Sequence, residues 1–215
     1  MATSPMLLLE AAPMNDGIEE NIIAIYDRHG RTWAGLRGDR PTEGAWLDRF
    51  CRLLSPGATV LDIGCGSGVP IARALARRGF DVTGIDGSAT MLTLFRENMP
   101  DTPALCADMR QLALDKRFGG LIAWDSFFHL SPKEQRSLFA RFAAHAEPGA
   151  PLMFTSGPKE GSAIGELEGE PLYHGSLSPE EYRMRLDATG FAIVDHVAED
   201  QSCGGRTIWL AQKRG

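Results

Sequence analysis

A run of glycines after a strand-like segment is the first feature of the sequence that could do chemistry. Residues 60–70 read Val-Leu-Asp-Ile-Gly-Cys-Gly-Ser-Gly-Val-Pro, and a helical pattern follows them. Glycines at a strand-to-helix turn let the backbone bend tightly and approach a ligand, and a helix start offers unpaired N–H groups. The pattern therefore predicts a small-molecule site at Gly64, Cys65, Gly66 and Gly68.

The residues around this turn disfavour a phosphate ligand. Val69 stands where the dinucleotide-binding pattern G-x-G-x-x-G has its last glycine, and no Gly-Lys-Ser/Thr sequence follows to hold a nucleotide phosphate. Asp62, inside the strand that precedes the glycines, would be unfavourable beside a pyrophosphate but suits a cationic ligand end.

Two further carboxylates favour a nucleoside. Asp86 ends the next predicted strand, where a carboxylate can accept both hydroxyls of a ribose. Asp108 ends the strand after that and suits the exocyclic amine of an adenine, while Met91 and Met109 offer soft apolar contact to the ring. The alternatives are a turn-forming role for Asp108 and plain core packing for the two methionines. Together with the glycine turn, these residues predict a nucleoside site.

Short apolar segments alternate with helical patterns, which is typical of an α/β fold with a parallel sheet. Helix starts are predicted where serine caps stand at Ser88, Ser131 and Ser178. A short loop joins the last two strands and permits only an antiparallel return. The predicted strands are 59–63, 80–85, 104–107, 118–124, 152–156, 191–197 and 206–211, with a further helix at 69–78.

Two segments lie outside this alternation. A predicted helix that begins at Asp16 and another from 43 to 54 precede the sheet, so residues 1–54 are predicted to form an N-terminal helical cap. Residues 55–215 then form a single domain. Within it, residues 157–176 are rich in glycine and glutamate and are the best candidate for a lid.

With these residues, the chain resembles the class I S-adenosylmethionine-dependent methyltransferases. Residues 60–68 are similar to the family's first motif, residues 84–88, which include Gly87, to its ribose motif, and residues 106–109 to its adenine motif. The resemblance implies a Rossmann-like, seven-stranded, mostly parallel sheet with a C-terminal antiparallel strand, helices on both faces, and S-adenosylmethionine at the carboxyl ends of the strands.

Residues 124–130 resemble the small-molecule members of the family. The resemblance implies that Trp124 and Asp125 touch the methionine part of the cofactor. His129 follows the same strand and is the candidate general base, with a structural role near the next helix cap as the alternative. A hydroxyl or protonated amine acceptor would use such a base, whereas a carboxylate or thiolate would need none.

Other candidate residues lie in the cap and the lid. Tyr26 and Trp33 are predicted to cover the sulfonium, and Arg37 to pair with the methionine carboxylate; ordinary helix packing is the alternative for each. Tyr173 and His174 are candidate substrate contacts at the end of the lid. The acidic composition of the lid favours a neutral or cationic acceptor, although a solvated acidic loop would have the same composition.

Composition excludes several classes of protein. The chain has 22 Lys and Arg against 28 Asp and Glu, a net charge of -6, so we expect no nucleic-acid partner. The short apolar run at 6–9 is too short to span a membrane and lacks the charged lead of a secretory signal. Four widely spaced cysteines predict reduced thiols in the cytoplasm, and no metal-binding pattern occurs.

Two other functions remain open from the sequence. The chain could bind S-adenosylmethionine without transferring its methyl group, as a regulatory protein or a different catalyst. A nicotinamide-dependent oxidoreductase is a weaker alternative because of Val69. The favoured prediction is a methyltransferase that acts on a small organic acceptor.

Overall fold

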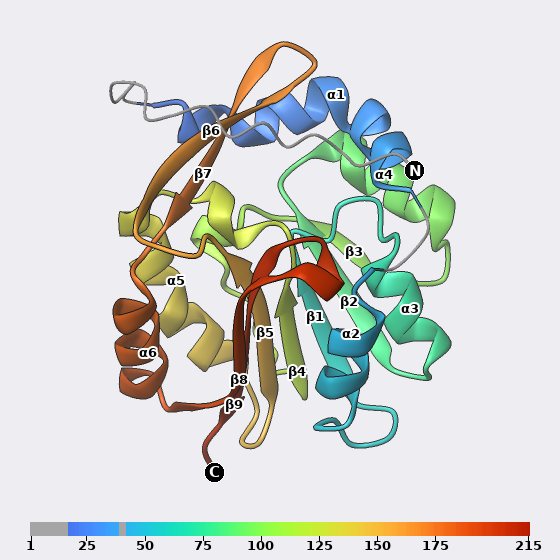
Figure 1. The fold of residues 1–215 in the computed structure, drawn as a ribbon. Helices are drawn as coiled ribbons and strands as arrows, with labels where there is room; N and C mark the ends of the chain where they lie inside the picture. Colours follow the sequence, from blue (N-terminus) through green and yellow to red (C-terminus); the bar gives the residue numbers. More distant parts are fainter. Residues whose placement is uncertain (1–16, 39–41) are drawn as a thin grey trace.

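The computed structural model describes residues 17–38 and 42–215, and its centre is a twisted seven-stranded sheet (Figure 1). The strand order is β3-β2-β1-β4-β5-β9-β8, and β9 runs antiparallel to both of its neighbours while the other pairs are parallel. The predicted fold class is confirmed. The strands are β1 (Thr59–Ile63), β2 (Asp81–Asp86), β3 (Ala104–Cys106), β4 (Gly120–Ala123), β5 (Pro151–Ser156), β8 (Phe191–Asp200) and β9 (Arg206–Lys213).

Helices cover both faces of the sheet. On one face lie α2 (Gly44–Cys51), α3 (Ile71–Arg77) and α4 (Ala89–Asn98), whose apolar side chains pack in one core cluster with Val60 and Ile122. On the other face lie α5 (Pro132–His145) and α6 (Pro179–Ala188), which pack with Leu61 and Leu121. Successive strand residues point to opposite faces, so each central strand contributes to both cores and is apolar along most of its length.

The serine caps fix where three helices begin. The side chain of Ser88 accepts a hydrogen bond from the backbone N–H of Met91, and Ser178 accepts one from Glu181. Ser131 forms a complete capping box with Glu134. These bonds satisfy N–H groups that a helix start leaves without partners, which is why the sequence located these starts correctly.

Two elements cover the carboxyl ends of the strands. Helix α1 (Ile22–Arg37) lies there beside a two-stranded hairpin, β6 (Gly161–Leu167) and β7 (Glu170–Ser176) (Figure 1). The hairpin falls within the predicted lid and stays outside the main sheet. Its Leu167 and Leu172 pack against Ile22 and Ile25 of α1.

An ion-pair cluster also fastens the hairpin to α1. The Glu170 carboxylate of β7 accepts hydrogen bonds from Arg28 (Nε to Oε1, 2.8 Å) and from His29 (2.6 Å).

The second helix of the predicted N-terminal cap packs against the main sheet. Helix α2 places its buried Trp46 and Phe50 in the sheet core. The division of the chain after residue 54 stays a prediction, and Asp16, the predicted cap of the first helix, lies outside the described residues. Within the described ranges, none of the helices combines the length and apolarity that crossing a bilayer requires.

Candidate functional site

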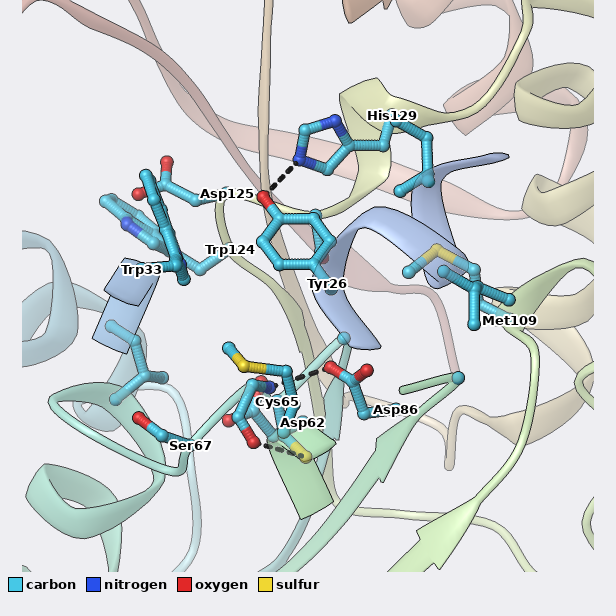
Figure 2. Close-up of a pocket in the computed structure, with 18 of the residues that line it drawn as sticks. Tyr26, Trp33, Asp62, Cys65, Ser67, Asp86, Met109, Trp124, Asp125 and His129 are labelled. Atoms are coloured by element: carbon cyan, nitrogen blue, oxygen red, sulfur yellow. Dashed lines mark hydrogen bonds between the residues drawn. The ribbon is translucent and has the colours of Figure 1, made fainter. Parts of the chain in front are cut away.

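A cavity lies at the carboxyl ends of β1, β2 and β4, under α1 (Figure 2). About 1050 Å³ of space lies between its walls, and this volume includes solvent at the open mouth. Most of the residues predicted for the site line it, although they come from distant parts of the chain. They are Tyr26, Trp33, Arg37, Asp62, Gly64, Cys65, Gly66, Asp86, Gly87, Met91, Asp108, Met109, Trp124, Asp125 and His129.

The glycine turn forms the floor of this cavity. Gly64 has a φ of 74°, and a Cβ there would lie 2.4 Å from the Cβ of Ser126, so only glycine fits. The N–H groups of Gly64 and Cys65 both donate to the carbonyl of Ile85, at 2.8 and 2.9 Å. The N–H of Gly66 donates to Asp86. Because these donors are already bonded within the protein, the turn does not present them to a pyrophosphate.

Asp86 is held in place by the backbone on both sides. Its Oδ2 accepts from the N–H of Gly66 at 2.9 Å, and its Oδ1 accepts from the N–H of Ser88 at 2.8 Å. Burial raises the pKa of this carboxyl, and the backbone hydrogen bonds oppose that rise. A carboxylate has about four acceptor sites, so two bonds leave capacity for the two hydroxyls of a ribose.

Asp62 is the group in the cavity that most needs a partner. The residue is 2% exposed, and its Oδ2 has no hydrogen-bond partner among the described residues. Burial, followed by the nearby charge of Asp86, raises the pKa of Asp62 to about 7. A buried carboxylate oxygen without a partner is costly, and a cationic group would satisfy it. The residues at this end therefore fit the ammonium of S-adenosylmethionine.

This unpartnered carboxylate leads to a prediction about stability and pH. Between pH 4 and 7 the folded chain keeps a proton on Asp62 that the unfolded chain has released, so the free energy of unfolding falls as pH rises through that range. We expect Asp62→Asn to raise the stability of the ligand-free protein at pH 8 by about 1–3 kcal/mol and to do so less at pH 5. Thermal unfolding at the two pH values measures this. A variant that is less stable at pH 8 would contradict it.

The predicted adenine contacts lie on the β3 side. Met91, Asp108 and Met109 line the cavity together with Ala107. The Asp108 carboxylate accepts from the Arg110 side chain, with Nε to Oδ2 at 2.8 Å, and from the backbone N–H of Arg110 at 2.9 Å. This bracing fixes the orientation of the carboxylate and leaves acceptor sites for an amine.

The opposite side of the cavity carries a tyrosine and a histidine in contact (Figure 2). The Tyr26 hydroxyl lies 3.0 Å from Nε2 of His129, and Nδ1 of His129 lies 2.8 Å from the backbone carbonyl of Tyr173. Burial lowers the pKa of His129 to about 4, so the ring is neutral at pH 7. A carbonyl can only accept, so Nδ1 carries the proton and Nε2 accepts from Tyr26.

Arg37 and Asp125 belong to a partly buried charge cluster at the side of the cavity. Arg37 donates to Glu43 and lies 3.9 Å from Asp125. Arg206 of β9 holds Asp125 through two bonds, Nε to Oδ1 at 2.9 Å and a second guanidinium nitrogen to Oδ2 at 2.8 Å. Trp124 is buried, and its Nε1 has no hydrogen-bond partner within residues 17–38 and 42–215.

Three predicted residues do not line the cavity. Gly68 packs beneath the turn, where a Cβ would lie 2.8 Å from Phe95. Tyr173 contributes its backbone carbonyl, which accepts from His129. The centroid of the His174 ring lies 5.0 Å from that of the His129 ring. Burial, with His129 second, lowers the pKa of His174 to about 3. The proposed roles of these side chains in binding stay predictions.

The acidic residues of the hairpin do not line the cavity either. The acidic composition of the predicted lid therefore does not indicate the charge of the acceptor. Sequence reasoning missed other lining residues. Ser67, Ala107 and Ser126 lie inside the quoted motifs, but no chemistry of their side chains singled them out. Glu19 and Ile23 reach the cavity only through the placement of α1, and the helical pattern of 16–25 was the sole signal. The remaining residues missed are Ile22, Ala34, Val69, Pro70, Ile71, Arg110 and Leu130.

Comparison with known proteins finds similarity to methyltransferases. A methyltransferase domain family matches residues 60–149. A dTDP-3-amino-3,6-dideoxy-alpha-D-glucopyranose N,N-dimethyltransferase of Streptomyces fradiae is 36% identical over 117 residues, which cover 53% of this chain and 46% of that protein. A ubiquinone biosynthesis O-methyltransferase of Pseudomonas paraeruginosa is 36% identical over 81 residues, 38% of this chain and 33% of that protein. The chain spans about half or less of the length of these two relatives.

Solved structures share the fold. The 1,6-didemethyltoxoflavin-N1-methyltransferase of Burkholderia thailandensis, solved with 1,6-didemethyltoxoflavin and S-adenosylhomocysteine, superposes with a TM-score of 0.69 at 18% identity. The match covers 95% of this chain and 93% of that one. The chain is therefore similar to the S-adenosylmethionine-dependent methyltransferases in the domain matched at residues 60–149, and it shares their fold.

Proposed function

We propose that the chain transfers the methyl group of S-adenosylmethionine to a nitrogen or oxygen atom of a small organic acceptor. One observation carries the proposal. A single cavity has at one end the buried carboxylate of Asp62, whose Oδ2 no group of the described chain satisfies, and at the other end a neutral Tyr26–His129 pair. The first end suits the cation of the cofactor, and the second suits an acceptor that carries a proton.

In this proposal, different residues of the cavity bind different parts of the cofactor. Asp86 accepts the ribose hydroxyls, Asp62 the ammonium, and Asp108 the adenine amine. Arg37, at the side of the cavity, pairs with the methionine carboxylate. When bound, the cofactor supplies a methyl group that its sulfonium has already activated. The main task of the protein is then to align the acceptor with that methyl, which can contribute roughly 7–11 kcal/mol at best.

Tyr26 and His129 hold and move the acceptor's proton in this proposal. The acceptor gives its proton to the Tyr26 oxygen while the Tyr26 proton passes to Nε2 of His129. The pair then consists of neutral tyrosine and imidazolium, and Nδ1–H keeps its bond to the carbonyl of Tyr173. That bond fixes the ring's orientation and its tautomer, since it holds the Nδ1 proton in place.

The proposal extends to partners and location. We place the chain in the cytoplasm with a small-molecule substrate, no nucleic-acid partner and no membrane partner. The net charge of -6 supports this placement, as do the four cysteines, which are all free thiols. Within residues 17–38 and 42–215, no group of three or more His, Cys, Asp and Glu residues is arranged to hold a metal ion. The proposal therefore assigns no metal to the site.

Two measurements test the proposal. Calorimetry should show that S-adenosylhomocysteine binds, and S-adenosylmethionine with a labelled methyl group should label at least one member of a panel of small amines, alcohols and phenols. Binding without labelling of any acceptor would favour a protein that binds the cofactor without methyl transfer. A dinucleotide that competes with S-adenosylhomocysteine would favour a nicotinamide enzyme instead.

A further inference from the structure

The hydrogen bonds of Tyr26 run in one direction only. The carbonyl of Tyr173 accepts a hydrogen bond from Nδ1–H of His129. Nε2 of the neutral ring must therefore accept, and Tyr26 must donate to it. The phenolic hydrogen is thereby committed. The Tyr26 oxygen, which lines the cavity, presents only lone pairs to whatever binds there. It can recognise an N–H or O–H donor, and it would repel a carboxylate.

The charge at this side of the cavity is negative. Glu19 lines the cavity and lies near the hairpin, where its charge contributes to raising the pKa of Tyr173. It makes no hydrogen bond or ion pair with the rest of the described chain. The cavity's arginines do not offset it, because Arg37 is paired with Glu43 and Arg110 with Asp108.

The walls between these groups are aromatic. Tyr26 and Trp33 meet edge to face with ring centroids 6.1 Å apart, and Trp33 lines the cavity beside Trp124. Aromatic faces attract cations, and more strongly when water is excluded. The lone pairs of Tyr26, the carboxylate of Glu19 and the aromatic faces together suit a cationic group that carries N–H donors.

We propose that the accepting group is an amine, attracted as an ammonium by Glu19 and held by an N–H bond to the Tyr26 oxygen. This inference rests on the proposed function and names its substrate class. The ammonium gives one proton to Tyr26 as the Tyr26 proton moves to His129, and the nitrogen keeps the electron pair with which it attacks.

The strength of the base favours an amine over an aliphatic alcohol. The pKa of His129 is about 4, and that of an alkylammonium is about 10. A hydroxyl as weakly acidic as water has a pKa of about 15.7. The proton transfer from an ammonium is therefore uphill by about half as many pKa units as the transfer from such a hydroxyl.

The test uses three probes of one shape: benzylamine, benzyl alcohol and benzoate. Each is titrated against the full chain saturated with S-adenosylhomocysteine, and binding is followed by ligand-observed NMR. We expect benzylamine to bind tightest and benzoate weakest. Glu19→Gln should weaken benzylamine about two- to fivefold, the usual size of a partly exposed charge interaction, and should leave benzyl alcohol unchanged. Added salt should reduce the same preference.

Glu20→Gln is the matched control, because Glu20 is the next residue, is exposed and does not line the cavity. It should leave all three affinities unchanged. Equal or tighter binding of the alcohol, no binding of benzylamine, or an equal effect of the two glutamine variants would overturn the inference. If these results occur in a protein that binds S-adenosylhomocysteine, the amine inference fails and the proposed cofactor site stands. If S-adenosylhomocysteine does not bind, both fail.

Discussion

Replacing Asp86 by alanine is expected to weaken S-adenosylhomocysteine binding by about 1–3 kcal/mol, or roughly 5- to 150-fold in Kd. The variant loses the acceptors for the ribose hydroxyls. It also frees the N–H of Gly66, which Asp86 now holds at 2.9 Å, so the glycine turn loses one of its fixed points. Both effects act on the same ligand, and calorimetry on the purified protein measures their sum.

Asp81→Ala is the control for this variant. Asp81 begins the same strand, β2, is exposed and does not line the cavity. Its replacement should leave the affinity unchanged, and thermal unfolding should show that both variants are folded. If Asp86→Ala bound S-adenosylhomocysteine as tightly as Asp81→Ala, the placement of the ribose would be wrong.

Replacing His129 by alanine should lower the turnover of methyl transfer by about 100-fold or more, which is the usual contribution of a general base. The affinity for S-adenosylhomocysteine should change little, because Asp62 and Asp86 lie on the other side of the cavity (Figure 2). Tyr26→Phe should reduce turnover as well, since it interrupts the same proton path. Steady-state kinetics with labelled S-adenosylmethionine separates these effects into kcat and KM.

The control for His129 is His196→Ala. His196 lies on β8, where its ring stacks on Trp209 at 3.5 Å, outside the cavity. Its removal should leave turnover unchanged. A fall in turnover of less than about threefold for His129→Ala would assign His129 a structural role only, far below the usual contribution of a base.

The cofactor half of the site could be predicted because it is local. The glycine turn, Asp62 and Asp86 lie on adjacent strands, and their spacing from the strand ends is visible in the sequence. The parallel register then brings them to one edge of the sheet without any further information. Helix starts at Ser88 and Ser131 were equally visible, because a cap acts on N–H groups within three residues.

The acceptor half could not be predicted to the same degree, because it depends on contacts between distant segments. Asp125 was expected at the cofactor, but its pairing with Arg206 joins two residues far apart in the chain. The Tyr26 hydroxyl donates to His129 because a backbone carbonyl of β7 fixes the tautomer of that ring, and no side-chain pattern in the sequence reveals this carbonyl. Glu19 reaches the cavity only because α1 packs across the strand ends.

The roof of the cavity consists of α1 and the β6–β7 hairpin, which contact each other and also rest on α4 and on the segment that follows β4. Its leucines and isoleucines form a separate apolar cluster, and Glu170 ties the hairpin to Arg28 and His29 rather than to the sheet. Because β7 also supplies the carbonyl that orients His129, changes in the hairpin can alter the acceptor end of the cavity while Asp62 and Asp86 stay in place. A chain built in this way can acquire a new acceptor through its roof and keep the same methyl donor.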